Sequence, residues 1–230
     1  MRVEVDNLWK RYRGAVALRG VSLNFESGKV TGVLGANGSG KSTMFRIIAG
    51  VTRQSEGTVR IDGREVGPET RLETAYLPEM DSFYTWMSVG EQLEFLSAFY
   101  PGWDAHKARE LLEFMSLTPG DRIDALSQGQ RARLKIVAAF AWPSRLVVMD
   151  EPFNGIDPPS RHRILQALVR EYRVDSQSIL LSTHMVDEVE ELVENVVYLR
   201  EGQVAIEGRA DDLRAEKSGS LSDIFEEIVL

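Results

Sequence analysis

The sequence contains no cysteine, and this absence excludes two kinds of site. A chain without cysteine has no disulfide framework and no thiolate metal site, which suits a reducing compartment such as the cytoplasm. Long hydrophobic runs are also missing. The longest, Ile136 to Trp142, is far shorter than the roughly 20 residues of a membrane-spanning helix. Met1 to Glu4 opens with charge and lacks the apolar stretch of a secretion signal. We therefore expect a soluble chain that reaches a membrane only through another subunit.

Positive charge is in the minority. The 27 Lys and Arg residues face 35 Asp and Glu residues, which gives a formal net charge of −8. This balance opposes the wrapping of nucleic acid, because phosphate neutralisation needs clustered cations, and we expect no nucleic-acid partner. The sequence also lacks the Asn-Lys-x-Asp string that reads guanine in GTPases. Its 230 residues, 43% of them hydrophobic, are sufficient for one domain with a sizeable core.

Hydrophobic periodicity predicts an α/β core that is interrupted by a helical stretch. Partial alternation in the first 25 residues indicates β structure, and short apolar runs indicate buried strands further on. The predicted strands cover residues 29–34, 146–149 and 179–182. The predicted helices of this core cover residues 41–49, a segment opened by Pro158 and Pro159, and residues 186–193. Such an order is typical of a mostly parallel sheet flanked by helices.

The stretch from residue 82 to residue 142 is helical in character. Three polar residues stand where a helix N-cap is expected: Ser88, Asp104 and Ser127. Glu91 and Gln130 lie three residues after the two serines, which completes two capping boxes. We therefore expect a helical subdomain inserted into the α/β core.

Aromatic residues gather at the start of this helical stretch. The spacing of Phe95 and Phe99 predicts that they belong to the core of the helical subdomain. Three others fit that core and a groove for a partner's helix equally well: Phe83, Tyr84 and Trp86. The apolar residues of the C-terminal tail also have helical spacing: Leu221, Ile224, Phe225, Ile228 and Val229. We expect this tail to fold back on its own domain, and a dimer contact is the alternative.

The string from Gly35 to Thr43 fits the phosphate-loop pattern G-x-x-x-x-G-K-[ST]. It follows a predicted strand and opens a predicted helix, which is the context that such a loop requires. Small residues let backbone N–H groups surround a phosphate. Lys41 adds a point charge for the β- and γ-phosphates, and Ser42 offers a hydroxyl to Mg²⁺. The nucleotide-binding candidates are Gly35, Asn37, Gly38, Ser39, Gly40, Lys41, Ser42 and Thr43.

Two acids end the predicted strand at residues 146–149. Asp150 would hold Mg²⁺ through water, and Glu151 would orient or deprotonate the water that attacks the γ-phosphate. An apolar run ending in Asp-Glu is common by itself. It becomes informative here because it follows a phosphate loop in the same chain.

Taken in order, these strings resemble the ATP-binding cassette (ABC) family over nearly the whole chain. Leu126 to Gln130 is similar to the family's signature, which distinguishes it from other P-loop nucleotidases. The resemblance implies that Tyr12 stacks on adenine and that Asp157 lies on a loop at the dimer interface. It also implies that His184, in Ser-Thr-His, is the switch histidine that contacts the γ-phosphate. The implied fold is a P-loop NTPase core with an N-terminal antiparallel β region and an inserted helical subdomain.

The signature has a physical reading of its own. Ser127 would cap the helix that follows and leave N–H groups and a hydroxyl aimed outward, which is a receptor for a phosphate. The resemblance implies that this phosphate belongs to the ATP of the other protomer. The residues that would contact it are Ser127, Gln128, Gly129 and Gln130. Each ATP would then be held between two chains.

Two residues depart from the family's pattern. Gln128 stands where glycine is commoner, and we expect the change to be tolerated because that position can lie beside the phosphate. Glu79 stands where the family usually carries a glutamine that senses the metal and couples to the transport subunit. A carboxylate can still ligate Mg²⁺. Relatives with Leu-Pro-Glu at this place resemble exporters more than importers.

The resemblance implies an ATP-hydrolysing subunit of an ABC transporter that uses ATP and Mg²⁺. Its partners would be a second copy and a separate transmembrane permease, which holds it at the cytoplasmic face of the membrane. The single domain, 1–230, would comprise an α/β core (1–81 and 143–215), a helical subdomain (82–142) and a helical tail (216–230). An alternative is a soluble ABC ATPase that acts on ribosomes or DNA, and a third is another P-loop enzyme such as a small-molecule kinase.

Overall fold

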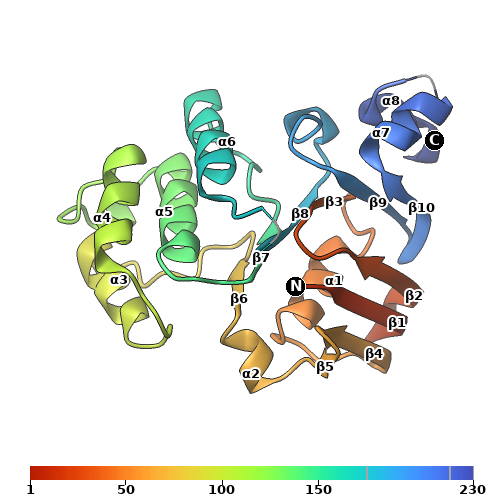
Figure 1. Cartoon of the computed structure of the whole chain (residues 1–230), viewed down its shortest axis with the longest axis horizontal. Coiled ribbons are helices and arrows are strands. Elements are labelled where there is room, and N and C mark those ends of the chain that lie inside the picture. The colour runs from red at the N-terminus through yellow and green to blue at the C-terminus, as the bar shows by residue number, and fades with distance from the viewer. Residues whose placement is uncertain (175, 218, 230) are drawn as a thin grey trace. The chain divides into compact units, whose positions relative to one another are not determined.

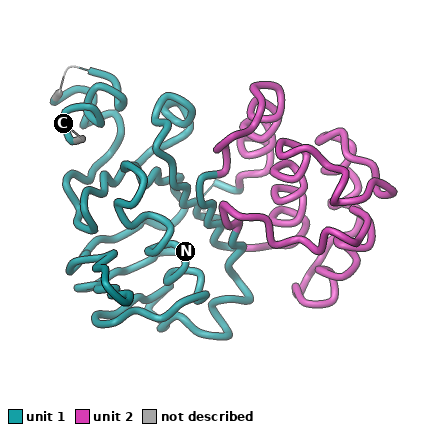
Figure 2. The backbone as a smooth tube through the Cα atoms, turned by 180° about the vertical axis from the view of Figure 1, so that it is seen from behind, with its two compact units in different colours: residues 1–76, 145–151, 173–230 teal, residues 77–144, 152–172 magenta. Residues whose placement is uncertain are grey.

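A computed structural model describes residues 1–174, 176–217 and 219–229. Its backbone contacts divide the chain into two compact units, which are coloured separately in Figure 2. The α/β unit comprises Met1–Tyr76, Arg145–Glu151 and Arg173–Leu230. The helical unit comprises Leu77–Ser144 and Pro152–Tyr172. The subdomain boundaries expected from the sequence stay a prediction.

A six-stranded sheet in the order β10-β9-β3-β8-β7-β6 carries the nucleotide motifs at its centre (Figure 1). Its strands are β3 (Val30–Leu34), β6 (Thr74–Leu77), β7 (Leu146–Asp150), β8 (Ser178–Thr183), β9 (Asn195–Arg200) and β10 (Gln203–Arg209). Every residue of β3, β7 and β8 is buried, and these strands pair in parallel. A parallel strand covered on both faces needs apolar residues throughout, which explains the continuous apolar runs.

A second, antiparallel sheet of order β2-β1-β4-β5 forms the N-terminal part. Its strands are β1 (Val3–Tyr12), β2 (Ala15–Phe25), β4 (Glu56–Ile61) and β5 (Arg64–Glu65). Gly14, with φ 86°, supplies the left-handed turn between β1 and β2. Helix α1 (Lys41–Ile48) contributes Met44, Phe45, Ile47 and Ile48 to one apolar cluster with residues of both sheets. This cluster fixes the helix that follows the phosphate loop.

The remaining elements of the α/β unit lie at its edges. They are α2 (Pro68–Arg71), the 3-10 turn η2 (Val186–Glu188), α7 (Ala210–Lys217) and α8 (Leu221–Val229). The prediction of a helix over residues 186–193 is wrong, because the structure forms only the short turn η2 in this segment. Five acids crowd residues 187–194, and like charges three or four positions apart destabilise a helix. One of them, Glu190, instead accepts hydrogen bonds from Arg214 and from the backbone N–H of Leu221.

The C-terminal tail packs on its own unit, as predicted. Leu221 and Ile224 of α8 are buried. The Tyr198 hydroxyl on β9 donates a 2.7 Å hydrogen bond to the carbonyl of Leu221, and its ring stacks on Phe225 at 6.1 Å. Burial raises the pKa of Tyr198 well above its ordinary value, so this hydroxyl remains a donor at physiological pH.

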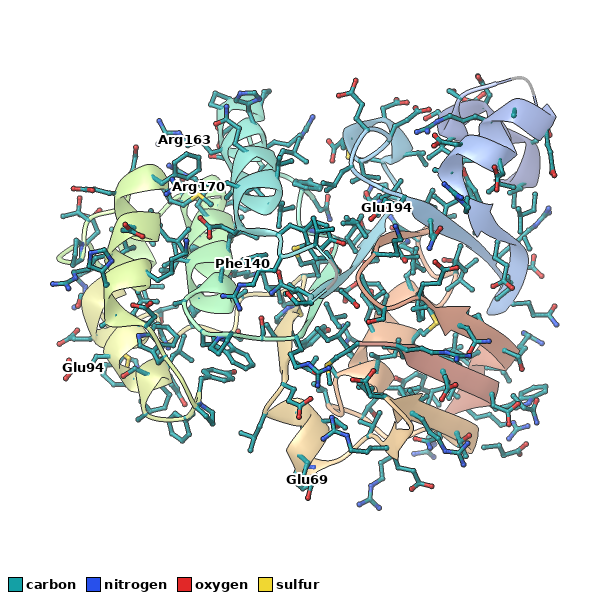
Figure 3. All side chains as sticks on the ribbon, viewed as in Figure 1. Glu69, Glu94, Phe140, Arg163, Arg170 and Glu194 are labelled. Carbon is teal, nitrogen blue, oxygen red and sulfur yellow. The ribbon has the colours of Figure 1, made fainter. Side chains whose placement is uncertain are left out.

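The helical unit consists of α3 (Val89–Ser97), α4 (Ala105–Phe114), the 3-10 turn η1 (Ile123–Ala125), α5 (Gln128–Phe140) and α6 (Pro158–Glu171). The three predicted N-caps are confirmed: Ser88 and Ser127 form capping boxes, and Asp104 accepts from the N–H groups of His106 and Lys107. Two arginines labelled in Figure 3 join α6 to α4. Arg163 donates to the carbonyl of Phe114, and Arg170 lies over the Phe114 ring.

The aromatic residues at the start of this unit face outward. Phe95 and Phe99 are 37% and 59% exposed, so the prediction that they belong to the core is wrong. Helix α3 buries Val89, Gln92 and Leu93 instead. Phe95 and Phe99 pack on each other at 5.0 Å and extend a row of rings from Trp86 through Tyr84. Their spacing correctly indicates a ring contact, but this contact lies on the solvent side, between α3 and the turn that follows it.

Candidate active site

The phosphate loop connects the buried end of β3 to α1, and glycine is required at two of its positions. A side chain at Gly35 would lie 2.5 Å from both Ser39 Oγ and the carbonyl of Leu199. Gly40, the N-cap of α1, has φ 109° and would place a side chain 2.7 Å from the carbonyl of Ala17. The backbone of the loop therefore passes close to the carbonyls of Leu199 and Ala17. The first N–H groups of α1 have no partner within the helix and can bind an anion.

Two groups of this loop fit a bound nucleotide. The hydroxyl of Ser39 is buried and has no hydrogen-bond partner among the residues that the structure describes. Lys41, only 4% exposed, donates to the carbonyls of Gly35 (2.7 Å) and Ala36 (3.2 Å) and lies 3.1 Å from Glu151 Oε1. A buried ammonium and an unsatisfied hydroxyl beside a helix N-terminus match the oxygens of a phosphate chain.

Asp150 ends β7 among three hydroxyl groups. Ser42 Oγ and Ser182 Oγ both donate to Asp150 Oδ1 at 2.8 Å, and the Tyr76 hydroxyl lies 3.5 Å from Oδ2. Burial, and then the charge of Asp150, raise the pKa of Tyr76 to about 12. Oxygen donors are what Mg²⁺ prefers, and it commonly takes one or two protein ligands beside water and phosphate. Ser42 and Asp150 therefore fit this ion.

Glu151 has an unusual backbone conformation that directs its carboxylate toward the loop. Its φ of 47° is in the left-handed region, which is uncommon for a residue other than glycine. Its N–H is held by the carbonyl and the hydroxyl of Ser182, at 3.1 and 3.0 Å. Its carboxylate contacts Lys41 on one oxygen and His184 Nδ1, at 3.0 Å, on the other. One buried acid thus contacts both Lys41 and His184.

Tyr12 ends β1 and is 44% exposed. The ammonium of Lys10 lies over its ring at 4.9 Å from the centroid. An aromatic ring flanked by a cation is a suitable platform for a flat base, since the ring retains a second face for stacking. Its contact with adenine stays a prediction.

The helical unit holds the second set of candidates. Ser127 caps α5, where its hydroxyl accepts from the N–H of Gln130. A side chain on Gly129 would lie 2.5 Å from Ser160 Oγ and still closer to Asp157 Oδ1, so the N-termini of α5 and α6 are in direct contact. Asp157 caps α6 by accepting from the N–H of Ser160, and this bond lowers the pKa of Asp157. Glu79 lies in the same unit.

The structure divides the predicted site residues into two groups, one in each compact unit. The phosphate loop, Asp150, Glu151 and His184 meet in the α/β unit. Glu79, the signature and Asp157 belong to the helical unit. The other two histidines, His106 and His162, are exposed, as expected.

Two residues that organise the site were not predicted. Ser182 orients both Asp150 and Glu151, and Asn154 donates to Glu79. The available signal for Ser182 is a polar residue next to the end of a buried strand, where apolar residues would be expected.

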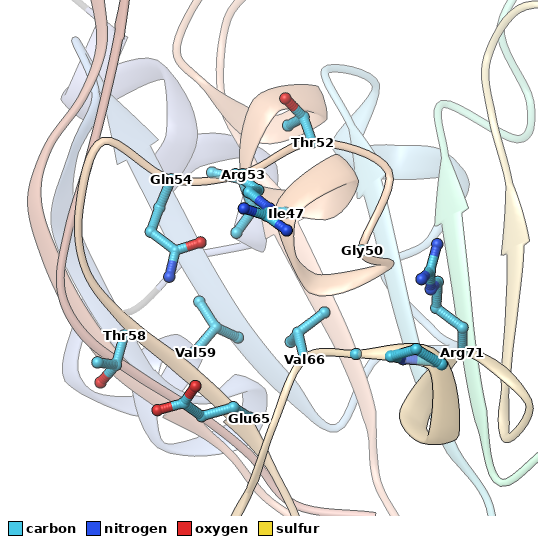
Figure 4. Close-up of a pocket in the computed structure, with 12 residues that line it drawn as sticks. Ile47, Gly50, Thr52, Arg53, Gln54, Thr58, Val59, Glu65, Val66 and Arg71 are labelled. Atoms are coloured by element: carbon cyan, nitrogen blue, oxygen red, sulfur yellow. The ribbon is translucent and has the colours of Figure 1, made fainter.

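A separate hollow of about 480 Å³ lies at the C-terminal end of α1 (Figure 4). Its apolar floor includes Ile47, Val59 and Val66, and its polar wall includes Arg53, Glu65 and Arg71. None of these residues belongs to the nucleotide motifs. The active site is therefore defined by the motif residues and their contacts, and not by this hollow.

A strand that ends in a Gly-rich loop, a helix that begins with a buried lysine, and a second parallel strand of the same sheet that leads into two acids define a P-loop nucleoside-triphosphatase. The chain belongs to the ABC transporter family, whose model matches residues 18–154. It is consequently an ATP-hydrolysing cassette, and its two sheets confirm the predicted fold class. None of the described helices has the length and apolar character that a membrane crossing requires.

Known proteins resemble the chain over most of its length. It is 32% identical to the ABC transporter ATP-binding protein YtrB of Bacillus subtilis (strain 168), over 93% of this chain and 74% of that protein. It is 31% identical to the Nod factor export ATP-binding protein I of Paraburkholderia xenovorans (strain LB400), over 94% and 74%. A dimeric ATP-binding cassette in a post-hydrolysis state, bound to ADP and Pi, matches with a TM-score of 0.81 and 25% identity, over 90% of this chain and 98% of that one.

Proposed function

We propose that this chain is the ATPase subunit of an ABC exporter, in which two copies close around two ATP molecules and drive a separate membrane permease. The observation that carries the proposal is the cluster of the buried Lys41 and Glu151 with the half-buried His184, beside the Ser42–Asp150 pair. Similarity to a Nod factor export protein supports the direction of transport. The permease would hold the chain at the cytoplasmic face of the membrane.

Each residue of the cluster has a role in this proposal. Lys41 binds the β- and γ-phosphates, and His184 contacts the γ-phosphate. Glu151 accepts a proton from the attacking water, and its contacts with Lys41 and His184 hold the carboxylate in place within the site. Ser42 and Asp150 would hold Mg²⁺, which when bound would neutralise the charge that develops on the phosphate oxygens. The family resemblance gives Glu79 a role in ATP turnover as a further candidate ligand of this ion.

The second copy supplies the rest of each site. Ser127 leaves the N-terminus of α5, a helix of 13 residues, available to a γ-phosphate from the facing protomer. Asp157 lies directly beside this turn. The dimeric form of a structurally similar cassette supports this arrangement.

The row of exposed rings is the surface that we assign to the permease. Tyr84, Trp86 and Phe99 are 46%, 64% and 59% exposed. Exposed aromatic clusters mark interaction surfaces in soluble proteins, because each ring offers a large apolar area with little conformational entropy to lose. From the sequence, Tyr84 and Trp86 fit either the core of the helical subdomain or a groove for a partner's helix. Their exposure supports the groove.

The test compares the tagged wild-type chain with Glu151→Gln, each purified from detergent-solubilised membranes in the presence of ATP. We expect Glu151→Gln to bind ATP and to turn it over about 10²–10⁴-fold more slowly, since an amide cannot accept the proton. Both chains should carry a stoichiometric multi-span membrane protein.

Glu207→Gln is the matched control, because Glu207 lies exposed on β10, outside every motif. Its turnover should equal that of the wild type. Near-normal turnover in Glu151→Gln would remove Glu151 from the role of base. A chain recovered without a membrane protein, or with ribosomes or DNA, would contradict the role in transport.

A further inference from the structure

Both residues that depart from the family's pattern contact the same residue. Asn154 Nδ2 donates to Glu79 Oε1 at 3.0 Å, and Gln128 Nε2 donates to the backbone carbonyl of Asn154 at 3.2 Å. All three belong to the helical unit, although they are distant in the sequence. The amide at residue 128 and the acid at residue 79 are therefore two ends of one hydrogen-bonded chain.

The loop that carries Asn154 is shaped to receive Gln128. Gly155 has φ 68°, and a side chain on it would lie 2.7 Å from Gln128 Nε2. The glycine thus allows the amide to approach the loop backbone closely. A glycine at residue 128, which the family commonly carries, would have no group with which to hold the Asn154 carbonyl.

The backbone around Glu79 is held independently of its side chain. Lys135 on α5 donates to the carbonyls of Pro78 and Glu79, each at 2.9 Å, and lies 3.0 Å from Asp81 Oδ1. Helix α5 therefore fixes the path of residues 78–81. These backbone contacts do not fix the direction of the exposed Glu79 carboxylate. The hydrogen bond from the Asn154 amide does so.

We propose that Asn154, anchored by Gln128, is a positioning residue that orients the Glu79 carboxylate for ATP turnover. An amide suits this position because it donates to the carboxylate without neutralising it, and the bond engages Oε1 rather than Oε2. The proposal rests on the role in ATP turnover that the proposed function gives Glu79. It does not depend on transport, since purified chain without a membrane partner is sufficient to test it.

The test is a cycle of Asn154→Asp, Glu79→Gln and the double variant. Asn154→Asp is nearly isosteric, but it places two carboxylates at hydrogen-bond distance. We expect ATP turnover to fall on the order of tenfold. In protein free of nucleotide and metal, the amide N–H groups of residues 79–82 should also exchange faster, because repulsion between the two carboxylates acts against the hold of Lys135 on the carbonyls of Pro78 and Glu79. In the double variant the amide introduced at residue 79 donates to the new acid. Turnover should then recover to within about threefold of Glu79→Gln alone, and the exchange rate should also recover.

Gln128→Met tests the anchor, because methionine keeps the length of the side chain and removes its donor. We expect faster exchange at residues 153–157 and a turnover lower by about threefold. Asn24→Asp and Gln203→Met are matched controls on β2 and β10, outside the site, and should behave as the wild type.

A purely structural role for Asn154 would make Asn154→Asp equally harmful with either residue at position 79. That result would overturn the proposal, as would wild-type turnover and exchange in Asn154→Asp. Recovery in both measurements supports it, because only a direct bond between residues 79 and 154 predicts rescue by the second substitution.

Discussion

Gly129 lies in the first turn of α5, where the helix leaves no room for a side chain. Alanine in a helix interior usually gains about 0.5–1 kcal/mol over glycine. Here the added methyl would overlap Ser160 Oγ, at 2.5 Å, and the carboxylate of Asp157. Overpacking of this kind costs about 1–3 kcal/mol, so we expect Gly129→Ala to lower the free energy of unfolding despite the gain in helix propensity.

The measurement is urea unfolding, with Gly120→Ala as the matched control. Gly120 has no atom within 4 Å of an added side chain. Its substitution should change the free energy of unfolding by no more than about 0.5 kcal/mol. Equal stabilities for the two variants would show that α5 and α6 are not in contact at Gly129.

Individual residues were predictable from the sequence where their chemistry is local. The phosphate loop and the two capping boxes each lie within one short string, so a pattern is enough to find them. Ser182 and Asn154 depend instead on pairings between distant segments. Ser182 reaches Asp150 because β7 and β8 pair in parallel with these two residues in register. No spacing along the chain records that register.

At the scale of elements, the N-cap of α4 gives the helical unit a dependence on pH. Hydrogen bonds from the N–H of Lys107, and then of His106, lower the pKa of Asp104 below its ordinary value of 3.8. A carboxyl group whose pKa is depressed by folding contributes stability above its unfolded pKa, and loses it as the pH falls through the folded pKa. This contribution is thus present at pH 7 and decreases below about pH 4.

Asp104→Asn should retain the cap, because asparagine is an equally good N-cap residue, but it has no proton to bind. We expect a stability near that of the wild type at pH 7 and a smaller loss between pH 5 and about pH 3, measured by urea unfolding across that range. Asp104→Ala should be less stable than both at pH 7. An identical pH dependence in Asp104→Asn and the wild type would contradict the assignment.

Helices and strands with strong local signals were predicted correctly, and the errors have physical causes. Buried strands such as β7 and β8 were visible as apolar runs, and α5 was visible from its cap. The segment at residues 186–193 has helical apolar spacing, but its acids repel one another and Glu190 bonds to the C-terminal tail. Spacing also cannot tell which side of α3 and of the turn after it is covered, so it does not predict that Phe95 and Phe99 face solvent.

At the scale of the whole molecule, a comparison of the two capping boxes can distinguish the effect of a cap on helix stability from its effect on dimerisation. Ser88 and Ser127 accept from the N–H three residues onward at the same distance, 3.2 Å, on α3 and α5. Replacing either by alanine removes one cap, so each variant should lose about 1 kcal/mol of unfolding free energy. Because the two variants should lose the same amount of unfolding free energy, any difference between their effects on dimerisation reflects the position of the cap.

If each chain holds half of every ATP site, the signature of one copy binds the phosphate of the ATP on the other copy. In the Glu151→Gln background with ATP, Ser127→Ala should therefore weaken dimerisation in analytical ultracentrifugation by about tenfold, because the hydroxyl and the fixed helix end are both lost. Ser88→Ala should leave the dimer unchanged at the same cost in stability. Equal weakening by both would mean that the cap acts only through folding, whereas no weakening by either would place the signature outside the interface.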